Sequence, residues 1–530
     1  MNFKTTCISF FTLISSLANA QDLSLDWQNT IGGSEFDFAN DIVVCADGSY
    51  LLIGSSESNI SGDKTEDSYG EEDYWIIKLN SLGNIEWQKT IGGNDDDFPT
   101  SAMQTQDGGY ILGGESYSNA SGLKTENVFG HNDYWIVKIN NVGEIEWQNN
   151  IGGSGRDYFF SISQTFDGGY ILGGSSESNI SGDKTENSNG HYDYWIVKTN
   201  ANGEIEWQNT IGGDGSDILG EIIQTNEGGY IIAGQSSSDI SGDKTEDCIG
   251  GIFPDYWIVK LDELGTIEWQ NTIGGTYIEN IASIIQTTDG GYLLGGHSMS
   301  DASDDKSENC LGWKDYWIVK LSKDGNIEWE NTIGGSINDY VSEVIEVPGG
   351  YLVGGHSESG ISGDKTEDTI NFSQDFWIVR LALDGTIIDQ NTIGGEGTEI
   401  LYFAKKGLDG NFIIGGASDS NISGDKTENS LGSFDYWLVK LNNEFLDINE
   451  LNVPSTFLYP NPSSDYLFIN NVSNTGISQI EIFNATGQLV TTIHQYNPSH
   501  GINLEGLQVG SYFLLLNNDE EIIPLKFFKN

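Results

Sequence analysis

The sequence predicts an all-β protein in which seven similar segments close into a ring. The phrase Trp-Gln-Asn-Thr-Ile-Gly-Gly, with small variations, occurs seven times at spacings of 60, 60, 60, 62, 60 and 60 residues. Each copy contains four short extended segments, and none has the 3.6-residue period of a helix. Four-stranded units that repeat in this way are the blades of a β-propeller, so we expect seven blades. The copies begin at Trp27, Trp87, Trp147, Trp207, Trp269, Trp329 and Asp389.

The third copy illustrates the four predicted strands. Residues 205–211 alternate apolar and polar side chains and end at a Gly-Gly pair, whereas 230–234 are continuously apolar, as in a strand covered on both faces. Residues 221–225 and 255–261 are the second and fourth extended segments. Glycine-containing turns separate the segments, so each copy is predicted to fold as an antiparallel sheet.

The two ends of the repeat region predict how the ring closes. The first extended segment, 25–31, precedes a complete copy, and the last copy ends after three strands at 436–441. If the N-terminal strand completes the last blade, every blade has four strands and no edge is left open. A linear β-solenoid is the alternative, but it needs atypical capping repeats, and the sequence contains none.

Several residue types recur in every copy and are best explained by packing. Seven tryptophans follow Asp-Tyr or Asp-Phe on the last strand, and each ring buries about 150–250 Å² in such positions. A lysine in the loop phrase Ser-Gly-Asp-Lys-Thr-Glu and a basic residue that ends each Tyr-Trp strand also recur. We interpret these lysines as clasps that fix the loops, with the Asp before Tyr-Trp as a partner. Trp313 breaks the pattern, and it is therefore the aromatic residue predicted to bind a ligand.

A Gly-Gly pair after an apolar strand and a Trp on the last strand resemble the kelch-type propeller blade. The pairs include Gly113-Gly114, Gly173-Gly174 and Gly295-Gly296. The period is longer than that of kelch repeats, and other signature positions differ. The resemblance therefore supports the fold and implies no function.

Strand alternation places the long loops and the Gly-Gly loops at one end of the propeller. Loops on a rigid scaffold usually carry recognition, so this end is the predicted binding face. Acids such as Asp97, Asp157, Asp217 and Asp339 are expected to make it carboxylate-rich. Oxygen-rich loops suit structural Ca²⁺, although an acidic surface that keeps the protein soluble is the alternative. The Ca²⁺ candidates are Asp63, Asp183, Asp243, Asp364 and Asp425.

Composition limits the remaining functional classes. The net charge of −56 opposes binding to nucleic acid, and no nucleophile, phosphate-loop or dinucleotide motif is present, so no catalytic residue is assigned. Apart from structural Ca²⁺, no cofactor is expected. We expect a monomer. Cys45, Cys248 and Cys310 form no disulfide framework, and a bridge between the last two stays open.

The N-terminus has the features of a secretory signal peptide. Lys4 precedes a short apolar stretch, and Ala18-Asn19-Ala20 fits the small-residue cleavage pattern. We therefore expect a signal peptide at 1–20, a propeller at 21–446, and no transmembrane segment. Because the first twenty residues contain one Lys and no acid, the charge after cleavage is −57.

A different all-β domain is predicted after the repeats, with strands near 466–470, 479–484, 489–494, 511–517 and 522–528. With so few strands we expect a small immunoglobulin-like sandwich over 457–530. Several motifs occur in order; their main residues are Pro460, Asn461, Pro462, Gly487, Gly510, Tyr512 and Lys526.

This tail resembles the type A C-terminal sorting domain of the type IX secretion system of Bacteroidota. The resemblance implies that the chain passes through Sec and then type IX export and is secreted or placed on the cell surface. It also implies the secretion machinery and its sortase as partners, with tail removal in a linker at 447–456. Anchoring versus release is left open.

These observations lead to a hypothesis with two alternatives. The first is an exported protein that recognises a glycan or a protein through its long-loop end. The alternatives are a polysaccharide-degrading enzyme and a structural surface-layer component. A cluster of acids and aromatic residues that breaks the repeat in one cleft would favour the enzyme.

Overall fold

The computed structural model describes residues 23–443 and, in the tail, 457–459, 466–470, 477–484, 489–494, 501–504, 506–507, 510–518 and 522–529. The chain divides into two compact units, one ending at Asn443 and the other beginning at Glu444. The predicted signal peptide and processing linker lie outside the described residues.

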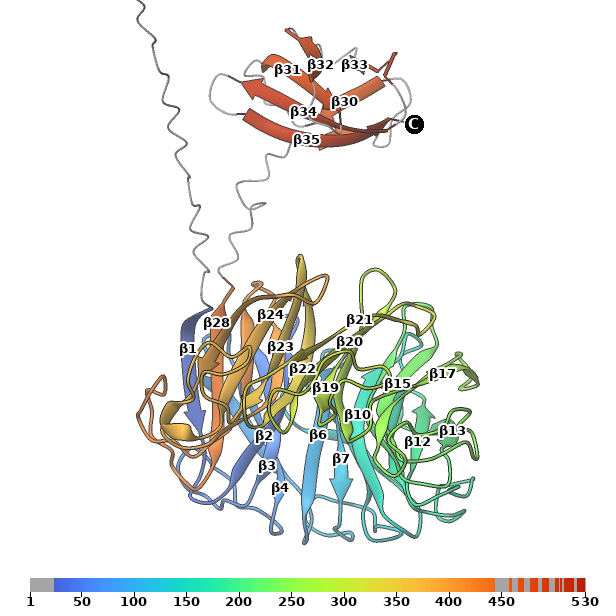
Figure 1. Cartoon of the computed structure of the whole chain (residues 1–530). Coiled ribbons are helices and arrows are strands. Elements are labelled where there is room, and N and C mark those ends of the chain that lie inside the picture. Colours follow the sequence, from blue (N-terminus) through green and yellow to red (C-terminus); the bar gives the residue numbers. More distant parts are fainter. Residues whose placement is uncertain are drawn as a thin grey trace, which may run out of the picture. The chain divides into compact units, whose positions relative to one another are not determined.

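The first unit is a seven-bladed β-propeller, as predicted (Figure 1). Blade 1 contains β2 (Asp37–Val44), β3 (Tyr50–Ser56), β4 (Asp73–Leu79) and β5 (Ile85–Ile91). Blade 2 contains β6 (Asp97–Gln104), β7 (Tyr110–Ser116), β8 (Asp133–Ile139) and β9 (Ile145–Ile151). Blade 3 contains β10 (Asp157–Gln164), β11 (Tyr170–Ser176), β12 (Asp193–Thr199) and β13 (Ile205–Ile211). Blade 4 contains β14 (Asp217–Gln224), β15 (Tyr230–Ser236), β16 (Asp255–Leu261) and β17 (Ile267–Ile273).

The remaining blades follow the same order. Blade 5 contains β18 (Glu279–Gln286), β19 (Tyr292–Ser298), β20 (Asp315–Leu321) and β21 (Ile327–Ile333). Blade 6 contains β22 (Asp339–Val347), β23 (Gly350–Ser357), the 3₁₀ turn η1 (Ile370–Phe372), β24 (Asp375–Ala382) and β25 (Ile387–Ile393). Blade 7 contains β26 (Glu399–Lys406), β27 (Phe412–Ser418), β28 (Asp435–Asn442) and, from the other end of the chain, β1 (Ser24–Ile31).

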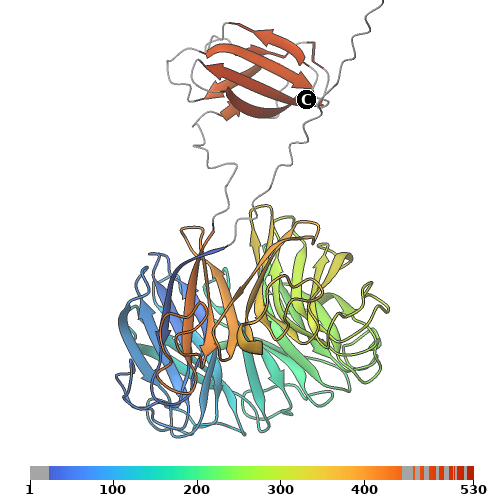
Figure 2. The same ribbon diagram turned by 60° about the vertical axis from the view of Figure 1, so that its left-hand side comes forward.

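The N-terminal strand closes the ring, which confirms the predicted latch. β1 pairs antiparallel with β28, with Gln28 opposite Val439 and Ile31 opposite Tyr436. Blade 7 therefore lies beside blade 1, and the orange and blue ends of the propeller meet (Figures 1 and 2). Closure leaves no blade with a missing strand.

The inner strands are longer than predicted and carry a bulge. In blade 4 the inner strand begins at Asp217 rather than at 221. The register shifts between Leu219 and Glu221, so Gly220 bulges out of the ladder without ending the strand. Every inner strand shifts at the equivalent place. Such bulges redirect side chains at the rim of a sheet.

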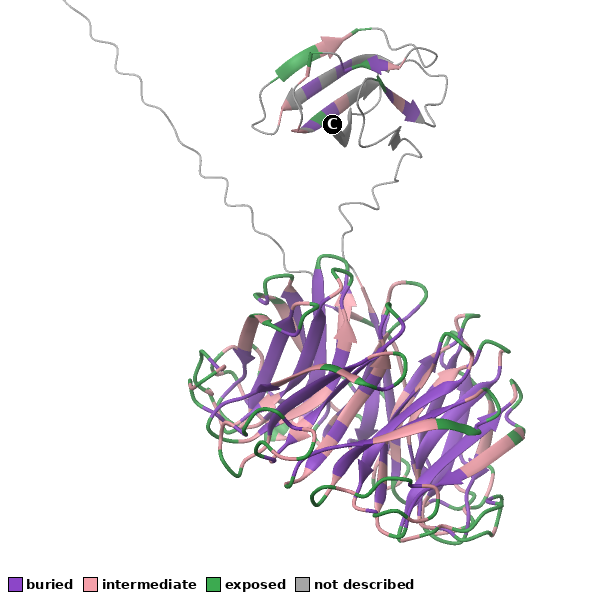
Figure 3. Cartoon of the chain, turned by 90° about the vertical axis from the view of Figure 1, so that its right-hand side faces the viewer, coloured by how far each residue is buried: buried purple, intermediate pink, exposed green. Residues whose placement is uncertain are grey.

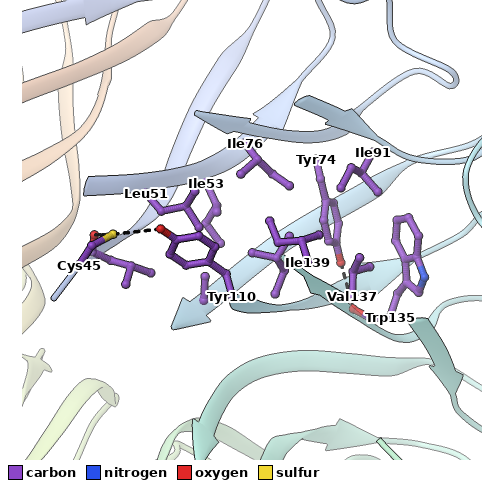
Figure 4. Close-up of a cluster of buried hydrophobic side chains, with 13 residues drawn as sticks. Cys45, Leu51, Ile53, Tyr74, Ile76, Ile91, Tyr110, Trp135, Val137 and Ile139 are labelled. Atoms are coloured by element: carbon purple, nitrogen blue, oxygen red, sulfur yellow. Dashed lines mark hydrogen bonds between the residues drawn. The ribbon is translucent and has the colours of Figure 1, made fainter. Parts of the chain in front are cut away.

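The hydrophobic core lies between neighbouring blades, so buried residues follow the strands and exposed residues the loops (Figure 3). Figure 4 shows one interface, where Tyr74 donates a hydrogen bond of 3.2 Å to the carbonyl of Trp135 in the next blade. The two ring centroids are 5.0 Å apart. All seven tryptophans of this type are at most 1% exposed, so the predicted packing role is confirmed.

The second unit consists of two small sheets. One contains β29 (Phe457–Tyr459), β30 (Tyr466–Asn470) and β33 (Ile502–Asn503), and the other contains β31 (Ile477–Asn484), β32 (Leu489–Ile493), β34 (Gly510–Asn518) and β35 (Ile522–Lys529). Side chains from both sheets, including Leu467, Ile480 and Leu514, form one buried cluster. The sheets therefore share a core, as in a sandwich.

Candidate functional sites

The two ends of the propeller differ as the sequence predicted. The long-loop face is formed by the seven loops 57–72, 117–132, 177–192, 237–254, 299–314, 358–374 and 419–434, together with the Gly-Gly loops. The two kinds of loop contact each other: the backbone N–H of Ser34 donates to Ser61 Oγ at 3.0 Å, and the Asp63 N–H donates to the Gly32 carbonyl at 2.8 Å. The tight turns between strands form the opposite end, which we call the tight-turn face.

The loop lysines are buried inside the blades and stabilise them. Lys184 Nζ donates a hydrogen bond of 2.6 Å to Thr210 Oγ1 and lies 5.2 Å from the centroid of the Trp195 ring. Burial lowers the pKa of Lys184 to about 8, although Asp157 and Asp193 oppose this shift. The lysine is thus a clasp, but it binds a hydroxyl and a ring rather than forming a direct ion pair with Asp193.

Four of the acids expected on the surface of the long-loop face are fully buried, which corrects their predicted place. Asp97, Asp157, Asp217 and Asp339 are 0% exposed. Asp157 Oδ2, for example, accepts hydrogen bonds from the Gly153 N–H at 2.6 Å and from Ser178 Oγ. These acids begin the inner strands and tie the Gly-Gly loop to the blade, so their role is structural.

The Ca²⁺ candidates each hold the preceding Gly-Gly loop. Asp63 Oδ2 accepts the Gly32 N–H at 3.3 Å, and Asp183 Oδ2 accepts the Gly152 N–H at the same distance. Asp243, Asp364 and Asp425 make the equivalent contact. Across the part of the chain that the structure describes, no group of three or more His, Cys, Asp or Glu residues has the geometry to hold a metal. Calcium stays a prediction, and a rise in melting temperature on adding Ca²⁺ would support it.

Trp313 lies on the long-loop face with 72% of its surface exposed. Its backbone N–H donates to the Ile337 carbonyl at 2.7 Å, so the loop that carries it is held against the next blade. Ile252 in blade 4 and Phe372 in blade 6 are 84% and 95% exposed. Neither residue was predicted from the sequence, although their loops, 237–254 and 358–374, are the two longest of the seven.

A second candidate site, which the sequence analysis also missed, is a cavity of about 260 Å³ surrounded by the inner strands. We call it the channel cavity. Every blade contributes its bulged residue: Asn40, Thr100, Phe160, Gly220, Ala282, Ser342 and Tyr402. The inner strands differ between the seven copies more than the other three strands do, and that difference was the available signal.

The channel cavity contains a cluster of charged groups that breaks the repeat. Lys405 Nζ lies 2.9 Å from both carboxylate oxygens of Glu343 and 3.7 Å from Asp41 Oδ1. Burial, and then the charge of Glu343, raises the pKa of Glu221 to about 7. The Lys405 side chain is 34% exposed, so solvent reaches the cluster.

The three cysteines of the propeller do not pair with one another. Cys45, Cys248 and Cys310 are all free thiols, so the open bridge between Cys248 and Cys310 does not form. Cys248 Sγ instead lies 2.7 Å from the Phe253 carbonyl oxygen and 3.0 Å from Asp255 Oδ2, and its single S–H can donate to one of them.

Comparison with known families identifies the tail. Residues 457–530 match the family described as the secretion system C-terminal sorting domain. The tail is a secretion sorting domain. The chain is therefore exported by the type IX system and is either placed on the cell surface or secreted. No helix among the described residues is long and apolar enough to span a membrane.

The structure places only part of the predicted sorting signal. Gly510 begins β34, Tyr512 lies in the same strand and is 7% exposed, and Lys526 lies opposite Phe513 in β35. Pro460, Asn461, Pro462 and Gly487 lie outside the described residues. The individual roles of these residues stay predictions.

Other comparisons carry no functional argument. No match was found among curated proteins. Among solved structures, the chain is similar to the WD40 domain of Pan2 from Neurospora crassa, with 9% identity, a TM-score of 0.41 and coverage of 78% of this chain and 95% of that one. A protein of unknown function from Dyadobacter fermentans gives 9% identity, a TM-score of 0.39 and coverage of 79% and 99%.

Proposed function

We propose that the chain is an exported binding protein whose long-loop face recognises an extracellular protein or glycan. The observation that carries this proposal is the set of exposed apolar side chains in three consecutive blades, Ile252, Trp313 and Phe372. Each lies in a loop segment that departs from the repeat. Exposed aromatic and aliphatic groups on a rigid scaffold are typical anchors of an interface.

The positions of the first and last strands also favour the long-loop face as the binding surface. Ser24 pairs with Asn442, so the first and last strands of the propeller end together. Asn443 Nδ2 donates to the carbonyl of Gly410, which lies in a tight turn. The first and last strands of the propeller therefore both end at the tight-turn face, and the seven long loops lie at the opposite end.

Aliphatic residues favour a protein partner over a glycan. Five isoleucines at one loop position are about 60% exposed on this face, namely Ile60, Ile180, Ile240, Ile361 and Ile422. Isoleucine offers apolar area but no flat ring on which a sugar can stack. Trp313 is the side chain that best suits a glycan.

A triple variant tests the proposal. We expect Ile252→Ala, Trp313→Ala and Phe372→Ala together to weaken binding to cells, matrix proteins or a glycan array at least tenfold, about 1.4 kcal/mol. The matched control is Leu82→Ala, Leu264→Ala and Leu408→Ala, which removes similarly exposed side chains from tight turns. Equal effects of the two triple variants would contradict the proposal.

A polysaccharide-degrading enzyme is the second candidate, because the channel cavity combines repeat-breaking acids with Phe160 and Tyr402. Its carboxylates Glu343 and Asp41 are engaged by Lys405, which opposes a role as free catalytic acids. A hydrolase screen of the secreted protein separates the two. Turnover that is lost in Glu221→Gln would favour the enzyme, and binding without turnover would exclude it.

A further inference from the structure

The residues that line the channel cavity differ from blade to blade. A structural role shared by all blades would instead give the same residue in every copy. The loop lysines, the Tyr-Trp pairs and the acids that begin the inner strands are nearly invariant among the seven copies. The bulged positions instead hold an amide, two hydroxyl-bearing aliphatic residues, two aromatic residues, glycine and alanine. The cavity is therefore asymmetric inside a symmetric scaffold, as expected for the site of one small ligand.

Part of the charged cluster has a structural role. Asp41 Oδ2 accepts the N–H of Ala102 at 3.0 Å, and Glu221 Oε2 accepts the N–H of Ile284 at 2.8 Å, each from the following blade. These bonds join neighbouring inner strands. Asp41 Oδ1 also accepts the Ile42 N–H at 2.8 Å, and Glu343 receives a hydrogen bond from the Ala404 N–H. These backbone bonds do not explain why the channel needs three carboxyls and one lysine.

The charge balance of the cavity leaves room for a second cation. Lys405 is bound by Glu343 through both oxygens and is also close to Asp41. Glu221 has no cation within 4.0 Å among the described residues. Its carboxyl receives only the Ile284 N–H and a hydrogen bond from Ser283. A buried carboxyl without a cation favours its neutral form, and an ammonium group beside it would restore the charge.

The rest of the cavity suits a carbon skeleton with hydroxyl groups. Ser101 offers a hydroxyl, Asn40 offers an amide oxygen without a partner among the described residues, and the rings of Phe160 and Tyr402 offer apolar faces. A volume of about 260 Å³ is smaller than the ~300 Å³ at the lower end of drug-sized pockets. The strongly negative chain also raises the local concentration of cations.

We propose that the channel cavity binds a small hydroxylated primary amine, with Glu221 as the partner of its ammonium group. This site is separate from the long-loop face, and it stands or falls independently of the proposed function. Glucosamine, a ring with several hydroxyls and one primary amine, belongs to this chemical class.

Calorimetry on the secreted protein tests the site with glucosamine as the probe and glucose as its neutral analogue. We expect glucosamine to bind at least tenfold more tightly than glucose. Glu221→Gln keeps an acceptor for the Ile284 N–H but removes the charge, and it should weaken glucosamine binding at least tenfold. Glu71→Gln, which removes an exposed acid from a long loop, should change it less than twofold. Absent glucosamine binding, equal binding of glucose, or no effect of Glu221→Gln would overturn the proposal.

Two further measurements cover the case in which Glu221→Gln fails to fold. Lys405→Met releases Glu343 and Asp41 and should tighten glucosamine binding; a loss in a folded variant would contradict the assignment. In the wild-type protein, binding should weaken from pH 7.5 to 5.5 as Glu221 takes up a proton. Protonation of the sugar amine would act in the opposite direction, so stronger binding at pH 5.5 would also overturn the proposal.

Discussion

The carboxyl of Asp375 in blade 6 faces the carboxyl of Glu399 in blade 7, and both side chains are fully buried. Asp375 Oδ2 accepts the Ile370 N–H, and Glu399 Oε2 accepts the Gly395 N–H. Two facing carboxyls can hydrogen-bond each other only when one of them carries a proton. Burial, with repulsion from Glu399, raises the pKa of Asp375 to about 8.

The same arrangement recurs at every blade boundary, where the Asp before Tyr-Trp faces the acid that begins the next inner strand. No donor among the described residues reaches Oδ1 of any of the seven Asp residues of the first type. A shared proton at each boundary would satisfy these oxygens. The other facing pairs are Asp73–Asp97, Asp133–Asp157, Asp193–Asp217, Asp255–Glu279, Asp315–Asp339 and Asp435–Asp37.

The free energy of unfolding should therefore fall as the pH rises from 5 to 8. The pKa values of Asp133 and Asp193 are raised to about 6 and that of Asp375 to about 8, in each case mainly by burial. These groups bind protons more tightly in the folded state, so their contribution is complete below pH 4 and is lost as each ionises. Urea titrations at pH 5, 6.5 and 8 measure the trend. Equal or higher stability at pH 8 would contradict it.

Asp375→Asn isolates one boundary. The asparagine amide can donate to Glu399, and its oxygen can still accept the Ile370 N–H, so no proton is needed. We expect the variant to be more stable than the wild type at pH 8 by on the order of 1 kcal/mol, the value of about one pKa unit. At pH 5 the two proteins should differ less. A variant that loses stability equally at both pH values would show that no proton is shared.

The repeat made most of the fold predictable. The same pattern of turns and strands in seven copies predicted the four-stranded blade. The extra strand at the start of the repeats and the missing strand at their end predicted the latch, in which Gln28 lies opposite Val439. The inner strand of blade 4 was predicted too short because a glycine often marks the end of a strand. Gly220 instead lies in a β-bulge, and the strand continues on both sides of it.

The candidate sites were less predictable for a physical reason. A carboxylate next to a loop is normally predicted to be exposed to solvent. Asp157 is buried instead, because Gly153 and Ser178, which donate hydrogen bonds to it, come from two other segments. The channel cluster joins Asp41, Glu343 and Lys405 from three blades, and only ring closure brings them together. Sequence spacing cannot place such residues.

Deletion of residues 457–530 should stop export across the outer membrane, because the sorting domain is then absent. The truncated protein should accumulate inside the cell envelope, while the full chain reaches the cell surface or the medium. Immunoblots of cell fractions measure the distribution. Surface delivery of the truncated protein would contradict the prediction.

The N-terminal latch should contribute as much stability as an internal strand pair. Gln28 Oε1 accepts the indole N–H of Trp437 at 3.1 Å, and its amide donates to the Asp425 carbonyl. Gln148 makes the same two kinds of bond within blade 2, to Trp135 and Leu123.

Gln28→Ala and Gln148→Ala are therefore matched variants. Each leaves a buried indole N–H without its acceptor, and we expect both to lose about 1–3 kcal/mol of unfolding free energy. Urea denaturation followed by tryptophan fluorescence gives the values. A much smaller loss for Gln28→Ala would show that the ring stays folded when the latch is weakened.

Blade 6 has replaced the ion pair that blades 2 to 5 use at the end of the Tyr-Trp strand. In blade 3, Lys198 binds Glu206 at 2.9 Å and Asp167 at 3.0 Å. Blade 6 has Ile388 at the place of the glutamate, and its turn contains Pro348 and Gly349 instead of an acid. Asp389, at the place of the usual tryptophan, forms the ion pair with Arg380.

Asp389→Trp should consequently destabilise the protein even though it restores the repeat. It removes the carboxylate partner of a guanidinium that is only 7% exposed, and such a loss costs about 3–5 kcal/mol. Adding Ile388→Glu supplies an acid at the place that Glu206 occupies in blade 3, so the double variant should regain most of that stability. A double-mutant cycle measured by urea denaturation tests the coupling. If the effects of the two substitutions on the free energy of unfolding are additive, a glutamate at position 388 does not reach Arg380. Asp389 would then not be a replacement for the missing glutamate.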